Sequence, residues 1–414
     1  MRPLALLCLL LLLSLPARPA LAQAAPFNFL RHKQKRTSAP LQVQRNLLIL
    51  SVRLNGAGPY NFLLDTGVPT TIITDPALAD SLRLRHGQQF RVVGAGGEAT
   101  GLLAYESTVS QLTIKGVVAD SLTVLVLSED VLNLGGYVGL PVHGILGSEL
   151  FRSFVVSVQP EQRRVLLHRP DAFRPPRGRR WASVPLRIEQ QKAYLTLPVQ
   201  LREGPELPLK LVLDTGAGHA LSLETNSDPR LTLPPQRLAA QLGRGLTGVV
   251  EGHLGRVARL RLGRYALAEV LTSFPNAADV GRRADVPRNG NLGYELLKRF
   301  VLVIDYPHGR LWLRPGTEYG QPFEHDMSGL DLVATGANFR RYFVTHVEPQ
   351  SPASESDLAV NDELLTINFM PSYSYSLTQL SRLLHSGDGR TLHLLVRRAD
   401  GELYTTLLRL RRQI

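Results

Sequence analysis

The sequence predicts a mainly β protein with two related lobes, followed by a small α+β domain at its C-terminal end. Two observations lead to this fold class. Strand-like apolar runs are separated by turn residues at intervals of about eight to twelve positions, whereas helical periodicity is scarce. One series of motifs also occurs twice in the same order, which indicates the internal repeat of a whole lobe.

The length of 414 residues fits two or three units of ordinary domain size. We place the first lobe at residues 42–170, the second at residues 183–316 and the C-terminal domain at residues 324–414. A segment rich in proline and arginine, from Arg169 to Arg180, joins the lobes, because its prolines disfavour regular structure and its charges keep it in water. The polar, basic residues 31–36 ahead of the first lobe are expected to be disordered.

Residues 1–22 have the layout of a secretory signal peptide. Arg2 precedes an apolar run from Leu4 to Leu13, and small residues end the segment before Gln23. An uncleaved membrane anchor is the alternative, but the run is short for a bilayer. We therefore expect an exported protein, periplasmic or extracellular, with no transmembrane anchor after signal cleavage. The single cysteine, Cys8, lies in this segment, so the mature chain is expected to lack disulfides.

The formal charge of +12 comes mainly from arginine. In a cytosolic protein such a charge would suggest nucleic acid as a partner. Here the arginines are scattered or gathered in the segment between the lobes, without interleaved aromatic residues or a nucleic-acid motif. A solvated basic surface is therefore the better interpretation, and no nucleic-acid partner is expected.

We expect strands at residues 47–54, 60–64, 70–74, 107–114 and 117–127 in the first copy of the repeat, and at residues 193–201 in the second. Three landmarks then recur in one order: Asp-Thr-Gly at 65–67 and 214–216, a glycine-flanked apolar element at 144–150 and 290–296, and an apolar strand ending in proline at 165–170 and 311–315. Three aligned landmarks are hard to produce by accident.

A lone aspartate at the end of a strand is more often a turn residue than a catalyst. Two equivalent copies about a pseudo-twofold axis would bring Asp65 and Asp214 side by side. Two adjacent carboxylates cannot both ionise easily, so one retains a proton while the other acts as a base. Such a pair can activate a water molecule for attack on a peptide carbonyl, with neither metal nor cofactor.

The residues that follow the aspartates are expected to support the pair. Thr66 and Thr215 can hydrogen-bond across to the opposite lobe, and the backbone amides at Gly67 and Gly216 can orient the carboxylates. His219 lies close behind in the sequence, but it has no second ligand at a metal-binding spacing, so we interpret it as a residue at the rim of the site.

The doubled Asp-Thr-Gly, each followed by an element ending in Leu-Gly, resembles the retropepsin/pepsin-like aspartyl protease family. With the C-terminal domain, the chain is similar to bacterial exported aspartyl proteases that carry a PDZ domain. The resemblance implies a bilobal all-β fold and a catalytic dyad of Asp65 and Asp214. Two positions depart from the family pattern: Val68 stands where a small residue is usual, and Asn291 where an aliphatic residue is usual.

Two glycine-rich stretches at similar distances after each aspartate predict hairpin flaps over the substrate cleft. The candidates are Gly96 and Gly97 in the first lobe and Gly245 and Thr247 in the second. Ordinary mobile hairpin tips would have the same composition, so this alternative stays open.

Residues 341–347 and 358–368 resemble a PDZ domain, whose exposed strand edge accepts an extended peptide. The resemblance implies that Tyr342, Phe343 and Val344 bind a C-terminal peptide opposite a helix at residues 377–384. A groove that the chain itself fills, or that only braces the lobes, is the alternative.

These features together predict an exported aspartic endopeptidase that acts on peptides or unfolded proteins, with a PDZ domain that binds substrate or partner peptides. The alternative function is a weakly active or inactive protease-like scaffold of the envelope, which the residues Val68 and Pro69 and the PDZ-like domain would suit.

Overall fold

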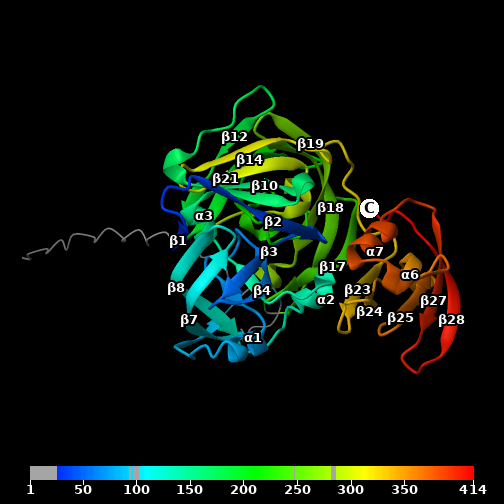
Figure 1. Cartoon of the computed structure of the whole chain (residues 1–414). Coiled ribbons are helices and arrows are strands. Elements are labelled where there is room, and N and C mark those ends of the chain that lie inside the picture. Colours follow the sequence, from blue (N-terminus) through cyan, green and yellow to red (C-terminus); the bar gives the residue numbers. More distant parts are fainter. Residues whose placement is uncertain (1–25, 93–95, 97–101, 247, 281–285) are drawn as a thin grey trace, which may run out of the picture.

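The computed structural model describes residues 26–92, 96, 102–246, 248–280 and 286–414. These residues form a two-lobed body with the C-terminal domain packed against one side (Figure 1). Strands dominate all three units, as the sequence predicts. Several strands have the expected bounds, because their alternating apolar residues are buried on one face: residues 47–54 and 117–127 are each one complete strand.

The first lobe contains β1 (Phe27–Phe29), β2 (Arg36–Gln44), β3 (Leu47–Leu54), β4 (Ala57–Leu64), β5 (Ile72–Ile73), α1 (Pro76–Ser81), β6 (Gln89–Val92), β7 (Leu102–Ile114), β8 (Val117–Leu127), α2 (Leu134–Val138), β9 (Gly144–Leu146) and α3 (Glu149–Ser153). The second lobe contains β13 (Arg187–Glu189), β14 (Lys192–Gln200), β15 (Glu206–Leu213), β16 (Leu221–Leu223), β17 (Arg237–Gly245), β18 (Gly248–Leu262), β19 (Tyr265–Pro275), α4 (Ala277–Val280), β20 (Gly290–Leu292) and α5 (Tyr294–Leu297).

Sheet topology establishes the repeat independently of the motifs. The order β3-β4-β9-β5-β8-β7-β6 in the first lobe is matched strand for strand by β14-β15-β20-β16-β19-β18-β17 in the second. The additional pairing of β3 with β7 is likewise matched by that of β14 with β18. In each lobe the strand directly before the aspartate pairs in parallel with the strand whose last residue is the leucine of Leu-Gly. The two lobes therefore have one fold.

A run of six paired strands joins the lobes and continues through β2 into the sheet of the first lobe. It adds β10 (Val155–Gln159), β11 (Arg164–His168), β12 (Ala182–Pro185), β21 (Phe300–Asp305) and β22 (Arg310–Pro315) to β2. Its order is β12-β22-β21-β10-β11-β2, with β10 and β21 antiparallel at the centre, where Ser157 lies opposite Val303. Each lobe thus contributes one hairpin to the sheet, and these hairpins place the two lobes about a common axis.

The basic residues 31–36 are not disordered, contrary to the expectation. Residues 31–35 form a turn between β1 and β2, and Arg36 begins β2. Arg169 holds this turn, because its guanidinium donates to the His32 and Gln34 carbonyls. Long-range pairing of β2 with β11 and β3 overrides the local composition.

The C-terminal domain contains β23 (Leu330–Thr335), β24 (Arg341–Val347), α6 (Pro352–Glu355), β25 (Glu363–Ile367), β26 (Met370–Pro371), α7 (Leu377–Leu384), β27 (Thr391–Arg397) and β28 (Leu403–Arg409). Its core is separate from those of the lobes. Helix α7 has the expected bounds, since Ser376 and Gln379 form a capping box at its start and Leu377, Leu380 and Leu384 face the core. Short 3-10 turns lie at Ser372–Ser374 in this domain and at Pro160–Gln162, Pro170–Ala172 and Thr225–Ser227 in the rest of the described chain.

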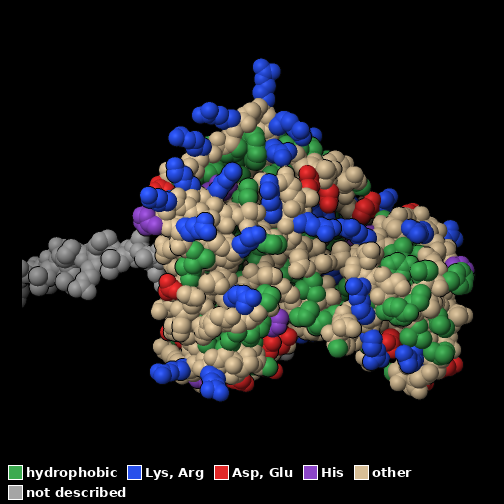
Figure 2. Space-filling view, in the orientation of Figure 1, with side chains coloured by type: hydrophobic (Ala, Val, Ile, Leu, Met, Phe, Trp, Pro, Cys, Tyr) green, Lys and Arg blue, Asp and Glu red, His purple; other side chains and the backbone are tan. Residues whose placement is uncertain are grey.

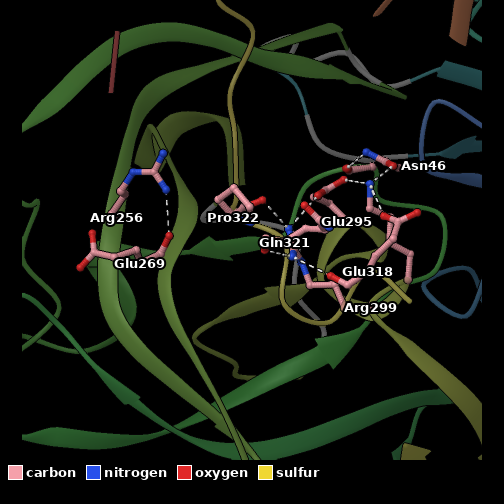
Figure 3. Close-up of polar contacts among 10 residues, drawn as sticks. Asn46, Arg256, Glu269, Glu295, Arg299, Glu318, Gln321 and Pro322 are labelled. Carbon is pink, nitrogen blue, oxygen red and sulfur yellow. Dashed lines mark hydrogen bonds and ion pairs between the residues drawn. The ribbon is translucent and has the colours of Figure 1, made fainter. Parts of the chain in front are cut away.

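Arg299 fixes the connection between the second lobe and the C-terminal domain (Figure 3). Its side chain is 2 % exposed, and its guanidinium donates to the carbonyls of Glu318, Gln321 and Pro322 and to the Glu295 carboxylate. The guanidinium also lies 3.6 Å from the centre of the Phe323 ring. This connecting segment is therefore held against the second lobe.

Lysine and arginine side chains are spread in separate groups over the face of the molecule in Figure 2, without a continuous basic surface. No helix among the described residues is both long enough and apolar enough to cross a membrane.

Candidate active site

Asp65 and Asp214 occupy equivalent positions at the ends of β4 and β15. The strands leading to them are fully buried at Leu64 and Leu213. The Asp65 amide donates to the Leu146 carbonyl and the Asp214 amide to the Leu292 carbonyl, each over 3.0 Å. The repeated Leu-Gly elements thus fix the backbone at both aspartates, which explains why they recur with the Asp-Thr-Gly sequences.

The two threonines join the loops, as the sequence predicts. The Thr66 hydroxyl donates to the Leu213 carbonyl (2.6 Å) and accepts from the Thr215 amide (3.0 Å). In return the Thr215 hydroxyl donates to the Leu64 carbonyl (2.8 Å) and accepts from the Thr66 amide (3.1 Å). Both side chains are fully buried, so these four bonds lock the loops in one relative position.

This lock brings the two carboxylates together across the interface between the lobes. A Cβ atom at Gly67 would lie 2.9 Å from Asp214 Oδ1, and one at Gly216 would clash with the Asp65 carboxylate. Each glycine amide donates to the aspartate of its own loop, Gly67 to Asp65 over 2.6 Å and Gly216 to Asp214 over 3.2 Å. Glycine is required at both positions because any side chain would displace the opposite carboxylate.

The two carboxylates lie in different environments. Burial, and then the adjacent charge of Asp214, raise the pKa of Asp65 to about 8, although the Gly67 amide and Lys192 oppose the shift. The side-chain amide of Asn291 donates to Asp214 Oδ2 over 2.8 Å. The equivalent residue of the first lobe is Ile145, which has no donor to offer Asp65. The raised pKa of Asp65 and the donor that only Asp214 has therefore make the two carboxylates unequal, with the proton favoured on Asp65.

Neighbouring residues complete the site. The Tyr306 hydroxyl donates to the Thr66 carbonyl over 3.4 Å, and burial raises the pKa of Tyr306, so it stays protonated. His219 lies near Asp214, and burial lowers its pKa although the Asp214 charge opposes this. Its Nε2 atom is buried without a hydrogen-bond partner in the described part of the chain. His219 is thus a neutral neighbour of the pair.

Val68 does not crowd the carboxylates. Its side chain packs against a hydrophobic cluster of the first lobe that includes Ile49 and Ile145. Its carbonyl accepts from the Ser148 amide over 2.9 Å, just as the equivalent Ala217 carbonyl accepts from the Tyr294 amide over 2.7 Å. Replacing a small residue by valine therefore leaves the backbone of the loop unchanged.

The predicted flaps correspond to the hairpins β6–β7 and β17–β18. Gly97 and Thr247 lie outside the described residues. Gly96 is buried, and its amide donates to the carbonyl of Asp279, which belongs to α4 in the second lobe. Gly245 pairs with Gly248 at the end of the other hairpin, and the adjacent Leu246 packs against the cluster of the first lobe. Each hairpin therefore reaches the opposite lobe.

Within the described residues, no group of three or more histidine, cysteine, aspartate or glutamate side chains is arranged to hold a metal ion.

Comparison with known proteins gives two family matches. Residues 50–150 match the aspartyl protease family, and residues 343–398 match the PDZ domain family. The chain combines an aspartyl protease domain with a PDZ domain. The first match contains Asp65 but ends before Asp214, and strand-for-strand equivalence extends the protease unit to the second lobe.

No curated protein matches the chain. Among solved structures, the aspartic proteinase from Irpex lacteus is 12% identical, with a TM-score of 0.42, covering 69% of this chain and 99% of its own. Basic 7S globulin from soybean is 10% identical, with a TM-score of 0.38, covering 70% of this chain and 97% of its own.

The PDZ domain presents a different edge from the one the sequence suggests. Tyr342, Phe343 and Val344 lie on β24, which pairs with β23 on one side and β25 on the other. Tyr342 and Val344 are fully buried. In the strand order β23-β24-β25-β27-β28 the two edges are β23 and β28, and α7 packs against β23. The groove for an added strand therefore runs along β23, beside α7.

Two features of the site were not predicted: the donor to Asp214 and the edge strand of the PDZ domain. Asn291 carried a signal, since it departs from the family pattern at a position next to the Leu-Gly element. The edge strand carried none, because strand order depends on pairing between distant segments.

Proposed function

We propose that this protein is an exported aspartic endopeptidase that hydrolyses peptide bonds with Asp65, Asp214 and an activated water molecule. The observation that carries the proposal is the pair of carboxylate loops locked by Thr66 and Thr215. Two carboxylates held this close, with Asp65 buried and Asp214 only half-buried, suit paired acid and base roles.

In this mechanism Asp214 is the base. The amides of Gly216 and Asn291 stabilise its ionised form, which takes a proton from a water molecule between the carboxylates. The water oxygen then attacks the peptide carbonyl carbon. Asp65, with its pKa raised to about 8, donates its proton to the carbonyl oxygen as the carbon becomes tetrahedral. Collapse of this intermediate with proton transfer to the nitrogen releases the amine product.

The substrates we propose are extended peptides and unfolded proteins, bound between the body of the protease unit and the hairpins β6–β7 and β17–β18. The contacts of Gly96 and Leu246 with the opposite lobe support a role for these hairpins as covers of the cleft. The PDZ domain would bind substrate or partner peptides.

We also propose that residues 1–22 direct export and are removed before Gln23. The first described strand, β1, begins at Phe27, whose amide donates to the Ser153 hydroxyl over 3.1 Å. Cleavage before Gln23 would therefore leave β1 intact. N-terminal sequencing of protein recovered outside the cytoplasm tests this. A mature chain that retains residues 1–22 would contradict it.

Cleavage of a denatured protein mixture across acid to neutral pH tests the enzyme proposal. Wild type is compared with Asp65→Asn and Asp214→Asn, with circular dichroism as the check on folding. We expect each substitution to abolish cleavage. If the wild type cleaves nothing, or the variants cleave equally well, the dyad mechanism is wrong and the scaffold function becomes the better explanation.

A further inference from the structure

The part of the groove between β23 and α7 that is lined by Leu332, Val333, Leu377 and Thr378 is already occupied in this structure. In Figure 1 the PDZ domain sits against α2 of the first lobe, with β23 and α7 toward the protease unit. A Cβ atom at Gly136 of α2 would lie 2.6 Å from Val333 Cγ2 on β23, and one at Gly139 would lie 2.9 Å from Leu377 Cβ on α7. Gly136 of α2 and Gly139, which follows the end of this helix, thus permit close packing against both walls of the groove.

Arg45, in the turn between β2 and β3, connects the same two walls. Its guanidinium donates to the Leu332 carbonyl of β23 over 3.2 Å, and its amide donates to the Thr378 hydroxyl of α7 over 3.3 Å. The guanidinium also donates to the Tyr137 carbonyl of α2 and lies 4.2 Å from the centre of the Tyr137 ring. A side chain of the protease unit therefore satisfies an edge carbonyl that an added strand would otherwise use.

The backbone amides of the loop before β23 already have a hydrogen-bond acceptor within the domain. PDZ-type recognition of a chain terminus uses free backbone amides of this loop to capture the terminal carboxylate. Here Asp326 Oδ1 accepts from the amides of Ser328 (2.8 Å) and Gly329 (2.6 Å). The Leu330 amide donates to the Ser328 hydroxyl over 3.1 Å. An internal carboxylate already fills the position that a terminal carboxylate would take, and its charge would repel one.

The residues that hold the PDZ domain also touch the loop that carries Asp214. Asn46 Nδ2 donates to the Gly218 carbonyl over 3.2 Å. A Cβ atom at Gly218 would lie 3.5 Å from the Arg45 carbonyl oxygen and 3.6 Å from the Tyr137 hydroxyl. The groove and the candidate active site thus share their supports in the β2–β3 turn and α2.

We propose that the β23–α7 groove binds an internal, extended segment of another polypeptide, not a chain terminus, and that this segment replaces the contacts of Arg45 and α2. The proposal deepens the peptide-binding role proposed above. An unfolded protein offers many internal segments that can add as a strand to β23, whereas the occupied amides of Ser328 and Gly329 leave a terminus without its usual partners. Binding and docking of the PDZ domain exclude one another.

The test uses the full chain with Asp65→Asn, so that bound peptides are not cleaved. The binding result then does not depend on whether the wild-type chain is an active protease. Random peptides are displayed in two forms, flanked on both sides or ending in a free carboxylate. The bait chain also carries Arg45→Ala, which weakens docking. The matched control chain carries Arg85→Ala instead, because Arg85 is an exposed arginine of the first lobe outside the contact. We expect the flanked form to be enriched.

Selected peptides are then synthesised with a free or an amidated C-terminus, labelled, and titrated. Arg45→Ala should bind them at least about fivefold more tightly than the Arg85→Ala control, because affinity falls with the fraction of chain that is docked. Amidation should change affinity less than about twofold, and Asp326→Ala, which frees the amides, should gain affinity only for the free carboxylate.

Three outcomes would overturn the proposal. These are the absence of any enriched peptide with the Arg45→Ala bait, equal affinity of the Arg45→Ala and Arg85→Ala chains, and a clear preference of the unaltered groove for a free carboxylate. Oxidised and reduced forms of a Gly136→Cys/Val333→Cys chain give a second check. The crosslink would hold α2 in the groove, so peptide binding should appear only after reduction.

Discussion

The hydrogen bond from Asn291 to Asp214 gives a sharp test of the proposed division of roles. Asn291→Leu keeps the approximate shape of the side chain and removes the donor that lies 2.8 Å from Asp214 Oδ2. Since this donor stabilises the ionised form, activity should require a higher pH in the variant. The acid limb of the pH–rate profile should therefore move upward.

The size of the shift follows from the kind of bond. Hydrogen bonds to charged groups contribute about 1.5–3 kcal/mol, and a change of about 1.4 kcal/mol corresponds to one pH unit. We therefore expect the acid limb to move by about 1–2 units. The alkaline limb reports loss of the proton from Asp65, whose pKa is raised to about 8 mainly by burial, so it should move much less.

The assay is the initial rate of cleavage of one peptide substrate at low concentration, measured across the pH range for wild type, Asn291→Leu and Asn226→Leu. Asn226 is an exposed asparagine of the same lobe and serves as the matched control. An unchanged acid limb in Asn291→Leu, with the fold intact, would refute the assignment of Asp214 as the base. A shift of the alkaline limb alone would indicate the reverse assignment.

Three further predictions follow from the loops. Thr215→Val leaves the Leu64 carbonyl and the Thr66 amide without their buried partners, so denaturant unfolding should show a loss of about 2–6 kcal/mol; a loss below about 1 kcal/mol would contradict the lock. Gly216→Ala places a methyl group against Asp65 and should abolish cleavage while the chain stays folded; retained cleavage would show that the carboxylates are farther apart. The folded chain keeps the Asp65 proton up to about pH 8, whereas the unfolded chain releases it near the ordinary value of 3.8, so the stability of the wild type should fall as pH rises through this window. Asp65→Asn should lack this decline, and parallel curves for the two proteins would disprove the shift.

The sequence predicts the repeated parts of the fold well because the signal there is local. The buried strands that end at Leu64 and Leu213, and the glycines that follow the aspartates, are determined by patterns of a few residues. Helix α7 is predictable for the same reason, since its cap and its apolar face lie within one short segment. Two copies of the same pattern then indicate that Asp65 and Asp214 meet.

What could not be predicted depends on contacts between distant segments. Residues 36–44 form a strand only because β11 and β3 pair with them, and their polar composition gives no sign of this. The edge strand of the PDZ domain depends on the order of five strands, so a motif at Tyr342–Val344 cannot reveal that β24 is interior. The occupation of the groove by Arg45 depends on how two separately folded units pack.

Asn291 and Ile145 occupy equivalent positions in the two lobes but differ in chemistry. This difference is possible only because both lobes belong to one polypeptide and are not identical subunits of a dimer. A dimer of identical subunits must place the same side chain at both positions, so its two aspartates would have the same donors. Here both lobes belong to one polypeptide, and each loop is free to vary on its own. The single chain therefore allows one aspartate to be fixed as the proton acceptor before any substrate breaks the symmetry of the pair.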